Sequence, residues 1–154
     1  MYQTSIVYDI ENDIKDLNYL EISSFFKSKG LEIEVSEEVP ETKQKIWKCV
    51  DLDKGILVAA STLEIRDGLY VLGDLAVQEE YRGLHIGKAL HDKVLEEAQK
   101  RGASEIWACA KVPEYYKQYG WFEIDRAKSP NISHCNECEE FNISCFPAII
   151  KKIF

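Results

Sequence analysis

The segment YRGLHIGKAL, from Tyr81 to Leu90, has two glycines four residues apart and then the start of a helical pattern. The first N–H groups of a helix have no partner within it, and its N-terminus carries roughly +0.5 charge. An anion is stabilised there, and glycine lets it approach the backbone. The segment therefore predicts a phosphate-binding turn. The alternative is that the glycines only let the helix pack closely on the preceding strand.

Two common phosphate motifs do not fit this segment. A P-loop requires G-x-x-x-x-G-K-[ST], but the stretch from Gly83 to Lys88 is one residue short, and Ala89 stands where a hydroxyl is needed. A dinucleotide fingerprint requires G-x-G-x-x-G directly after a strand, and these glycines have a different spacing. The sequence excludes both classes.

Composition is that of an ordinary globular protein. The 154 residues are 45% hydrophobic and 30% charged, which predicts one domain over residues 1–154. The net charge of -8 argues against a nucleic-acid partner. No apolar run is long enough for a membrane span, and no signal peptide is evident. An odd number of cysteines, five, fits reduced thiols, so we expect a cytoplasmic protein.

Hydrophobic periodicity predicts the secondary structure. Strands are expected at residues 4–10, 45–53, 55–67, 67–77, 104–110, 121–127 and 142–154. Helices are expected at residues 12–30, 88–102 and 113–120, the first capped by Asn12 and ended by Gly30. The three consecutive central strands predict an antiparallel meander. The fold class is therefore α+β, with a mixed, mostly antiparallel sheet flanked by helices.

The longer segment DLAVQEEYRGLHIGKAL resembles the acyl-CoA-binding motif of the GNAT superfamily of N-acyltransferases, in which a Leu-x-Val strand leads into Arg-x-x-Gly-x-Gly. The resemblance implies the GNAT fold and acetyl-CoA as co-substrate. It implies that the pantetheine arm lies along Leu75, Ala76 and Val77. It also implies that a cradle for the pyrophosphate is formed by Arg82, Gly83, Leu84, His85, Ile86, Gly87 and Lys88. His85 departs from the family, which usually has glycine there, so the imidazole must point away from the phosphates or donate to them.

A second segment, VPEYYKQYGWFEI, resembles the family's Phe-Tyr-x-x-x-Gly-Phe stretch. By this resemblance Tyr116 is the acid that protonates the leaving thiolate, since a tyrosine with a pKa near ~10 keeps its proton at neutral pH. The alternative is an aromatic packing residue. A backbone N–H, expected at Val77, would stabilise the oxyanion. The asparagine often seen upstream falls near Cys109, so its contact to pantetheine is not carried over.

A base is also needed to take a proton from the incoming ammonium. Asp74 is the best-placed carboxylate by sequence, and strand alternation puts it on the face opposite Leu75 and Val77. The alternatives are a purely structural aspartate, with water, Glu32 or Glu34 as the base. His91 lies off the apolar stripe of its helix and is expected to face solvent.

A cysteine-containing loop is expected at about residues 130–145. Its His134, Cys135, Cys138 and Cys145 include one C-x2-C, which is half of a common zinc pattern, but the second half is absent. A metal site, a disulfide and a reduced loop therefore stay open as interpretations, and the chemistry itself is expected to need no metal.

The sequence thus predicts an N-acetyltransferase that transfers acetyl from acetyl-CoA to a primary amine by direct attack in a ternary complex. The acceptor is a small-molecule or peptide amine: a polyamine, an amino acid, an antibiotic, or a protein N-terminus or lysine. The alternative is a non-catalytic acyl-CoA-binding sensor of the same fold. By family resemblance, a homodimer through the C-terminal strands is plausible.

Overall fold

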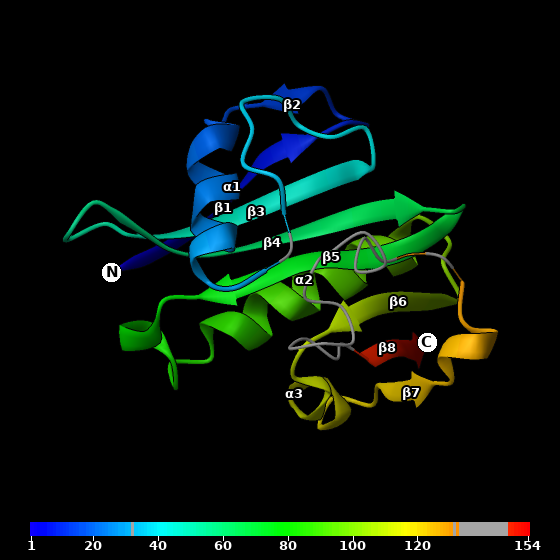
Figure 1. Ribbon diagram of the computed structural model, residues 1–154. Helices are drawn as coiled ribbons and strands as arrows, with labels where there is room; N and C mark the ends of the chain where they lie inside the picture. The colour runs from blue at the N-terminus through cyan, green and yellow to red at the C-terminus, as the bar shows by residue number, and fades with distance from the viewer. Residues whose placement is uncertain (32, 131, 133–147) are drawn as a thin grey trace.

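The computed structural model describes residues 1–31, 33–130, 132 and 148–154. Within this part, eight strands form one sheet, with three α-helices and two short 3-10 helices (Figure 1). The elements are, in order, β1 (Tyr2–Asp9), β2 (Ile14–Lys15), α1 (Tyr19–Ser28), β3 (Lys43–Asp51), β4 (Ile56–Arg66), β5 (Leu69–Val77), η1 (Glu79–Tyr81), α2 (Ile86–Lys100), β6 (Glu105–Ala110), α3 (Pro113–Lys117), β7 (Phe122–Ile124), η2 (Arg126–Lys128) and β8 (Ala148–Ile153).

The sheet is mixed and mostly antiparallel, as the sequence predicts. Its strand order is β2-β1-β3-β4-β5-β6-β8-β7. The predicted meander is formed by β3, β4 and β5. Among the described strands, β5 and β6 are the one parallel pair, because α2 carries the chain from the end of one to the start of the other.

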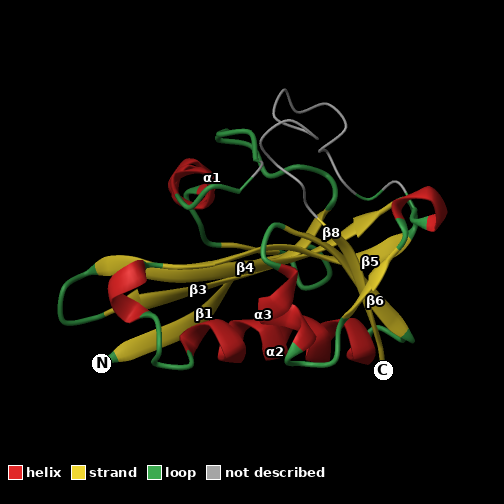
Figure 2. Ribbon diagram, turned by 60° about the horizontal axis from the view of Figure 1, so that its bottom comes forward, coloured by secondary structure: helices red, strands yellow, loops and turns green. Residues whose placement is uncertain are grey.

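Helices cover both faces of the sheet: α1 lies on one face, and α2 and α3 lie on the other (Figure 2). Phe26 of α1 packs with Val7 and Ile46 in one apolar cluster. Leu90 and Val94 of α2 belong to a second cluster, on the other face. None of the described helices has the length and apolarity that crossing a membrane requires.

The start of the first helix differs from the prediction. The helix begins at Tyr19, and Asn18 caps it by accepting a hydrogen bond from the N–H of Leu20 at 3.1 Å. Asn12, the predicted cap, instead donates its side-chain amide to Asp9 Oδ2 at 2.7 Å. Asn12 therefore stabilises the turn that leads into β2, which pairs with β1.

Candidate active site

The parallel strands β5 and β6 pair at one position and then separate. Val71 and Trp107 are the register partners. Past this pair lies a cavity of about 660 Å³, lined by residues 72–77 of β5 and by residues 108–112 at and after the end of β6. Leu75, Ala76 and Val77, the predicted pantetheine residues, all line it. The separation of the two strands thus creates a space in the sheet itself.

The backbone of β5 presents N–H groups to this space. The N–H of Gln78 donates to the carbonyl of Val58 at 2.8 Å, on the side of β4. Successive residues of a strand point their N–H groups to opposite sides. The N–H groups of Leu75 and Val77 therefore point toward β6 and the cavity.

The turn between η1 and α2 closes one end of the cavity. Gly83 (φ 85°) and His85 (φ 62°) both have left-handed backbone conformations. His85 caps α2 without a side-chain capping bond from the described residues, and the first turn carries no acidic residue. All the predicted cradle residues line the cavity except Leu84, which is 49% exposed. Glycine adopts a left-handed conformation more easily than histidine does, in keeping with the glycine that the resemblance leads us to expect at the position of His85.

Gly87 lies where α2 packs closely against its neighbours. A Cβ at this residue would lie 3.0 Å from Tyr115 Oη and 3.3 Å from Val77 Cγ2. The close approach of α2 to β5 and α3 thus leaves little room for a side chain at this position, and a larger residue would require Tyr115 or Val77 to shift. This supports the packing interpretation of the motif, and that interpretation is compatible with phosphate binding at the same turn.

Tyr115, Tyr116 and Tyr119 form an aromatic wall of the cavity. The ring centroid of Tyr115 lies 5.2 Å from that of Tyr116 and 5.5 Å from that of Tyr119, and both contacts are edge-on. Burial raises the pKa of Tyr115 to about 12 and raises the pKa of Tyr116 well above its ordinary value. Both phenols therefore carry their protons at neutral pH.

Asp74 lines the same cavity as Tyr116, on the face opposite Leu75 and Val77. It is 5% exposed, and its Oδ2 accepts bonds from Thr62 Oγ1 at 3.1 Å and from Lys43 Nζ. Its Oδ1 accepts no hydrogen bond from the described residues. One carboxylate oxygen is thus occupied, and the other has no hydrogen-bond partner among the described residues.

The alternative bases are less well placed. Glu34 is exposed and is not among the residues that line the cavity. Glu32 lies outside the described residues. Asp74 is therefore the one described carboxylate that lines the cavity.

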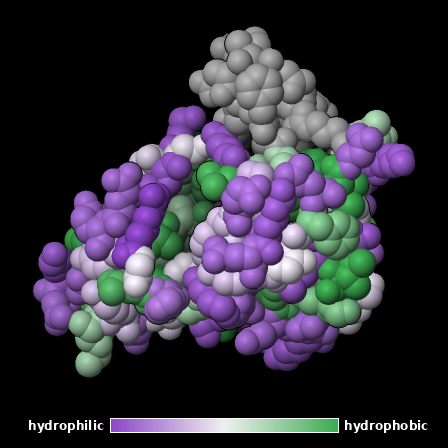
Figure 3. All heavy atoms as spheres, turned by 90° about the horizontal axis from the view of Figure 1, so that it is seen from below, coloured by the Kyte–Doolittle hydropathy of each residue, from purple (hydrophilic) through white to green (hydrophobic). Residues whose placement is uncertain are grey.

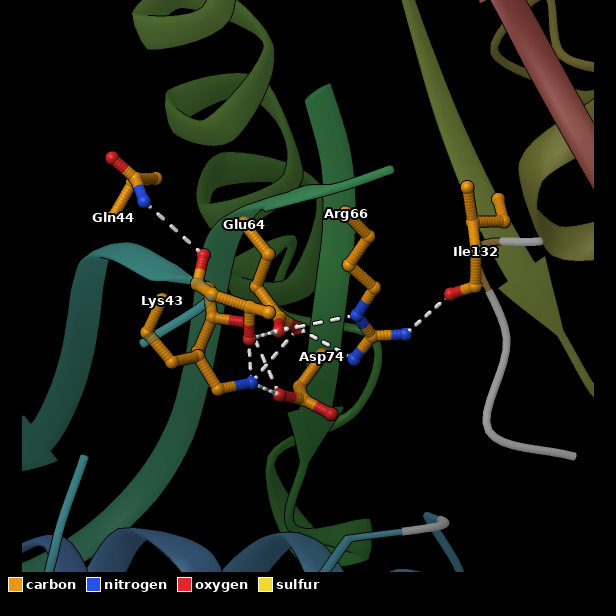
Figure 4. Close-up of polar contacts among 8 residues, drawn as sticks. Lys43, Gln44, Glu64, Arg66, Asp74 and Ile132 are labelled. Atoms are coloured by element: carbon orange, nitrogen blue, oxygen red, sulfur yellow. Dashed lines mark hydrogen bonds and ion pairs between the residues drawn. The ribbon is translucent and has the colours of Figure 1, made fainter. Parts of the chain in front are cut away.

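Asp74 belongs to a group of four charges that we call the ion cluster: buried Lys43, Glu64 and Asp74, and partly buried Arg66 (Figure 4). Glu64 Oε2 lies 2.9 Å from both Lys43 Nζ and Arg66 Nη2. Burial alone would raise the pKa of Glu64, but Lys43 and Arg66 outweigh it and lower the pKa to about 2. Burial likewise opposes the charge on Lys43, yet Asp74 and Glu64 raise its pKa above the ordinary value. The two cations and two carboxylates balance, as buried charges require.

The ion cluster was not predicted from the sequence, although a signal was present. Glu64 and Arg66 alternate with apolar residues in β4, so they share one face of a strand that is otherwise buried. A charged pair in such a position must find partners inside the protein. Those partners are Lys43, which pairs in register with Glu64, and Asp74, which pairs with Thr62, two residues before Glu64 in β4.

The prediction that His91 faces solvent is wrong. His91 is 1% exposed, because α3 and Trp121 cover the side of α2 next to the Leu90 stripe. Its Nε2 accepts a bond from Trp121 Nε1 at 3.0 Å. The residue lies directly behind the aromatic wall of the cavity.

Of the predicted cysteine loop, His134, Cys135, Cys138 and Cys145 lie outside the described residues. Cys109 lines the cavity, at the place where the family's asparagine is often seen. Among the described residues, no group of three or more metal-ligating side chains comes together.

Comparison with known protein families matches residues 14–121 to the acetyltransferase (GNAT) family. The chain belongs to the GNAT acetyltransferase family. The matched range contains the separated strands, the turn into α2 and the aromatic wall. The predictions of the family, of its fold and of an acyltransferase enzyme are confirmed.

Several solved structures resemble this GNAT chain. A GNAT acetyltransferase from Staphylococcus aureus Mu50 has 17% identity and a TM-score of 0.67, covering 98% of this chain and 99% of that one. The NatC complex bound to Gag peptide and CoA has 17% identity and a TM-score of 0.67, with coverages of 99% and 98%. N-acetylglutamate synthase from Neisseria gonorrhoeae, with coenzyme A and N-acetyl-glutamate, has 13% identity and a TM-score of 0.64, with coverages of 98% and 35%. At these identities the likeness shows the fold. No curated protein sequence matches the chain.

Proposed function

We propose that this protein transfers an acetyl group from acetyl-CoA to a primary amine by direct attack in a ternary complex. The observation that carries the proposal is the meeting, in one cavity, of an opened parallel strand pair, a helix N-terminus and a protonated tyrosine. The odd cysteine count further favours the cytoplasm as the place of this reaction.

The cavity offers suitable partners for each part of acetyl-CoA. The pyrophosphate would accept hydrogen bonds from the backbone N–H groups of residues 83–88, where the helix dipole favours negative charge. The pantetheine arm would lie along residues 75–77 of β5. Coenzyme A in two of the similar structures supports this assignment.

In the reaction, the amine nitrogen bonds to the thioester carbon and the C–S bond breaks, giving the acetylated amine and the thiol of CoA. The N–H of Val77 would donate to the developing oxyanion, since it points into the cavity. Tyr116 would donate its phenolic hydrogen to the leaving sulfur, and the resulting phenolate would take up the hydrogen that the nitrogen loses as the amide forms. Asp74 would accept the proton of the incoming ammonium at Oδ1, the oxygen that Lys43 and Thr62 leave available.

A thiol-release assay tests the proposal. Acetyl-CoA and a panel of amines are mixed with the enzyme, and free CoA is followed with a chromogenic disulfide, with a blank lacking amine to correct for the protein's own thiols. We expect Tyr116→Phe to lower kcat by about 100-fold or more with little change in the KM for acetyl-CoA. Tyr70→Phe is the matched control, because Tyr70 lies on β5 but does not line the cavity.

The alternative function gives a different result in the same experiment. A non-catalytic sensor would bind CoA saturably and release no thiol with any amine. Release that is equal in wild type and in Tyr116→Phe would leave acetyl transfer in place but remove Tyr116 from it.

A further inference from the structure

Behind the aromatic wall, Asp92, His91 and Trp121 form a continuous hydrogen-bonded chain. Trp121 Nε1 lies 3.0 Å from His91 Nε2, and His91 Nδ1 lies 2.9 Å from Asp92 Oδ1. His91 and Trp121 are 1% and 3% exposed, while Asp92 reaches the surface of α2. The chain thus runs from the protein surface to the back of the cavity wall.

The partners fix both the charge and the tautomer of His91. An indole N–H can only donate, so Nε2 must be the nitrogen without a hydrogen. Nδ1 therefore carries the hydrogen and donates it to the carboxylate of Asp92. Burial, the largest influence, lowers the pKa of His91 below its ordinary value, in agreement with a neutral ring.

The hydrogen-bonded chain lies against Tyr116, the residue to which we assign the acid role. The ring of Trp121 meets that of Tyr116 edge-on at 5.6 Å, and the rings of His91 and Tyr116 lie 6.3 Å apart. Helix α3, which carries Tyr116, has five residues and none is fully buried. So short a helix does not fix its own side chains, and the contacts with Trp121 and His91 supply what it lacks.

We infer that His91 is a positioning residue, which holds Trp121 by its Nε2 and through Trp121 holds Tyr116 in the cavity. This inference rests on the proposed function only for its effect on catalysis. The structural part, that His91 sets the positions of the Trp121 indole and the Tyr116 ring, stands by itself.

The geometry gives the device a pH dependence. Protonation of His91 at Nε2 would turn this nitrogen into a donor. Two donors would then face each other, and the hydrogen bond between Trp121 and His91 would break. The charged and titratable groups around His91 are Asp92 and Lys88 on α2, Lys152 on β8, and Tyr116 and Tyr119 at α3. Asp92 favours the protonated ring, and the two lysines oppose it. Since the folded-state pKa is lowered, the contribution of this bond to stability is complete above pH 6.5, the ordinary value, and is lost as the pH falls from there through the lower folded-state pKa.

Two substitutions of His91 separate the hydrogen bond from simple packing. His91→Gln retains an acceptor for Trp121 but cannot titrate, and His91→Leu removes the acceptor. We expect His91→Leu to lower kcat by about 10- to 100-fold with the KM for acetyl-CoA nearly unchanged. His91→Gln should retain most of kcat and lose the acidic limb of the kcat–pH profile that His91 contributes. Trp121→Phe should match His91→Leu, and the double variant should lose no more than either one alone.

Nuclear magnetic resonance of the protein without substrates provides a readout independent of activity. The chain has three tryptophans, so the Trp121 indole N–H signal is the one missing in Trp121→Phe. With tyrosine labelling, the Tyr116 ring signal is the one missing in Tyr116→Phe. Both signals should move in wild type as the pH is lowered and in His91→Leu at neutral pH, but stay constant with pH in His91→Gln.

The thiol-release assay and the magnetic resonance spectra together distinguish failure of the proposed function from failure of the positioning role of His91. If the signals respond to His91 as expected but wild type releases no thiol with any amine, the proposed function fails and the positioning role stands. If wild type is active but His91→Leu has the wild-type kcat and pH profile, or if neither signal depends on residue 91, the positioning role is overturned.

Discussion

His85 adopts a backbone conformation that glycine adopts more easily. Its φ of 62° places Cβ in a crowded position, although histidine tolerates this region better than most side chains. The residue also lines the cavity where a diphosphate would lie. The turn therefore has a conformation that suits glycine, but it carries an imidazole next to the cavity.

Substitutions of His85 should separate the effect of backbone strain on stability from the effect of the imidazole ring. His85→Gly and His85→Ala both remove the ring, but only alanine must keep a Cβ in the left-handed region. We expect His85→Gly to have the larger free energy of unfolding of the two, by about 1 kcal/mol. Urea denaturation measures the difference, and an alanine variant as stable as the glycine variant would contradict the strained conformation.

Among the elements, β5 contains a bulge that gives Asp74 its orientation. Thr62 pairs with Asp74 and the next residue, Leu63, pairs with Leu72, so Gly73 is the extra residue. Leu72 consequently packs in the cluster on the α2 face, whereas Asp74, two residues later, joins the ion cluster on the other face. Without the bulge, the two side chains would share a face.

Gly73 should be essential to this arrangement. A Cβ there would lie 1.6 Å from Glu64 Oε2, so alanine must displace Glu64 from Lys43 and Arg66. We expect Gly73→Ala to lower the free energy of unfolding by about 3–5 kcal/mol, the cost of breaking a buried ion pair. In a Glu64→Ala background, Gly73→Ala should lower the free energy of unfolding by much less. Equal costs in the two backgrounds, measured by urea denaturation, would show that Glu64 is not what Gly73 accommodates.

Local patterns were sufficient to predict most elements but could not settle contacts between distant ones. The meander and the turn into α2 follow from alternation and from glycine spacing within single segments. Asn12 and Asn18 are both adequate helix caps, and the pairing of β2 with β1 selects Asn18. His91 is buried by Trp121, a residue thirty positions away, so no pattern within its own helix could reveal it. The ion cluster likewise depends on three strands meeting in register.

The ion cluster makes the stability of the whole molecule sensitive to acid. Because the folded-state pKa of Glu64, about 2, is below its ordinary value of 4.5, its stabilising contribution is present above pH 4.5 and is lost as the pH falls toward 2. The contribution should be on the order of 3 kcal/mol. We expect Glu64→Gln to be less stable at neutral pH but to lose less free energy of unfolding across this range.

The matched control for this prediction is Glu80→Gln, since Glu80 is exposed and outside the ion cluster. Its free energy of unfolding should follow wild type across the pH range. A wild-type curve that is parallel to that of Glu64→Gln would contradict the assignment of the acid sensitivity to Glu64.

The cradle carries the cations Arg82 and Lys88, whereas the molecule as a whole is acidic. The protein has a net charge of -8, and the face in Figure 3 is mostly hydrophilic. Lys88 is paired with Asp92 at 2.6 Å, which leaves Arg82 as the cradle cation without an ion pair among the described residues. On the function that we propose, an anion at this turn would therefore be bound by the backbone N–H groups, with Arg82 as the side chain free to assist them.

A crystal structure with coenzyme A tests that claim most directly. We predict that diphosphate oxygens lie at hydrogen-bonding distance, about 2.7–3.2 Å, from backbone nitrogens of residues 83–88, with the pantetheine arm along residues 75–77. Coenzyme A bound elsewhere, or a cradle filled by the imidazole of His85 at saturating coenzyme A, would contradict the account.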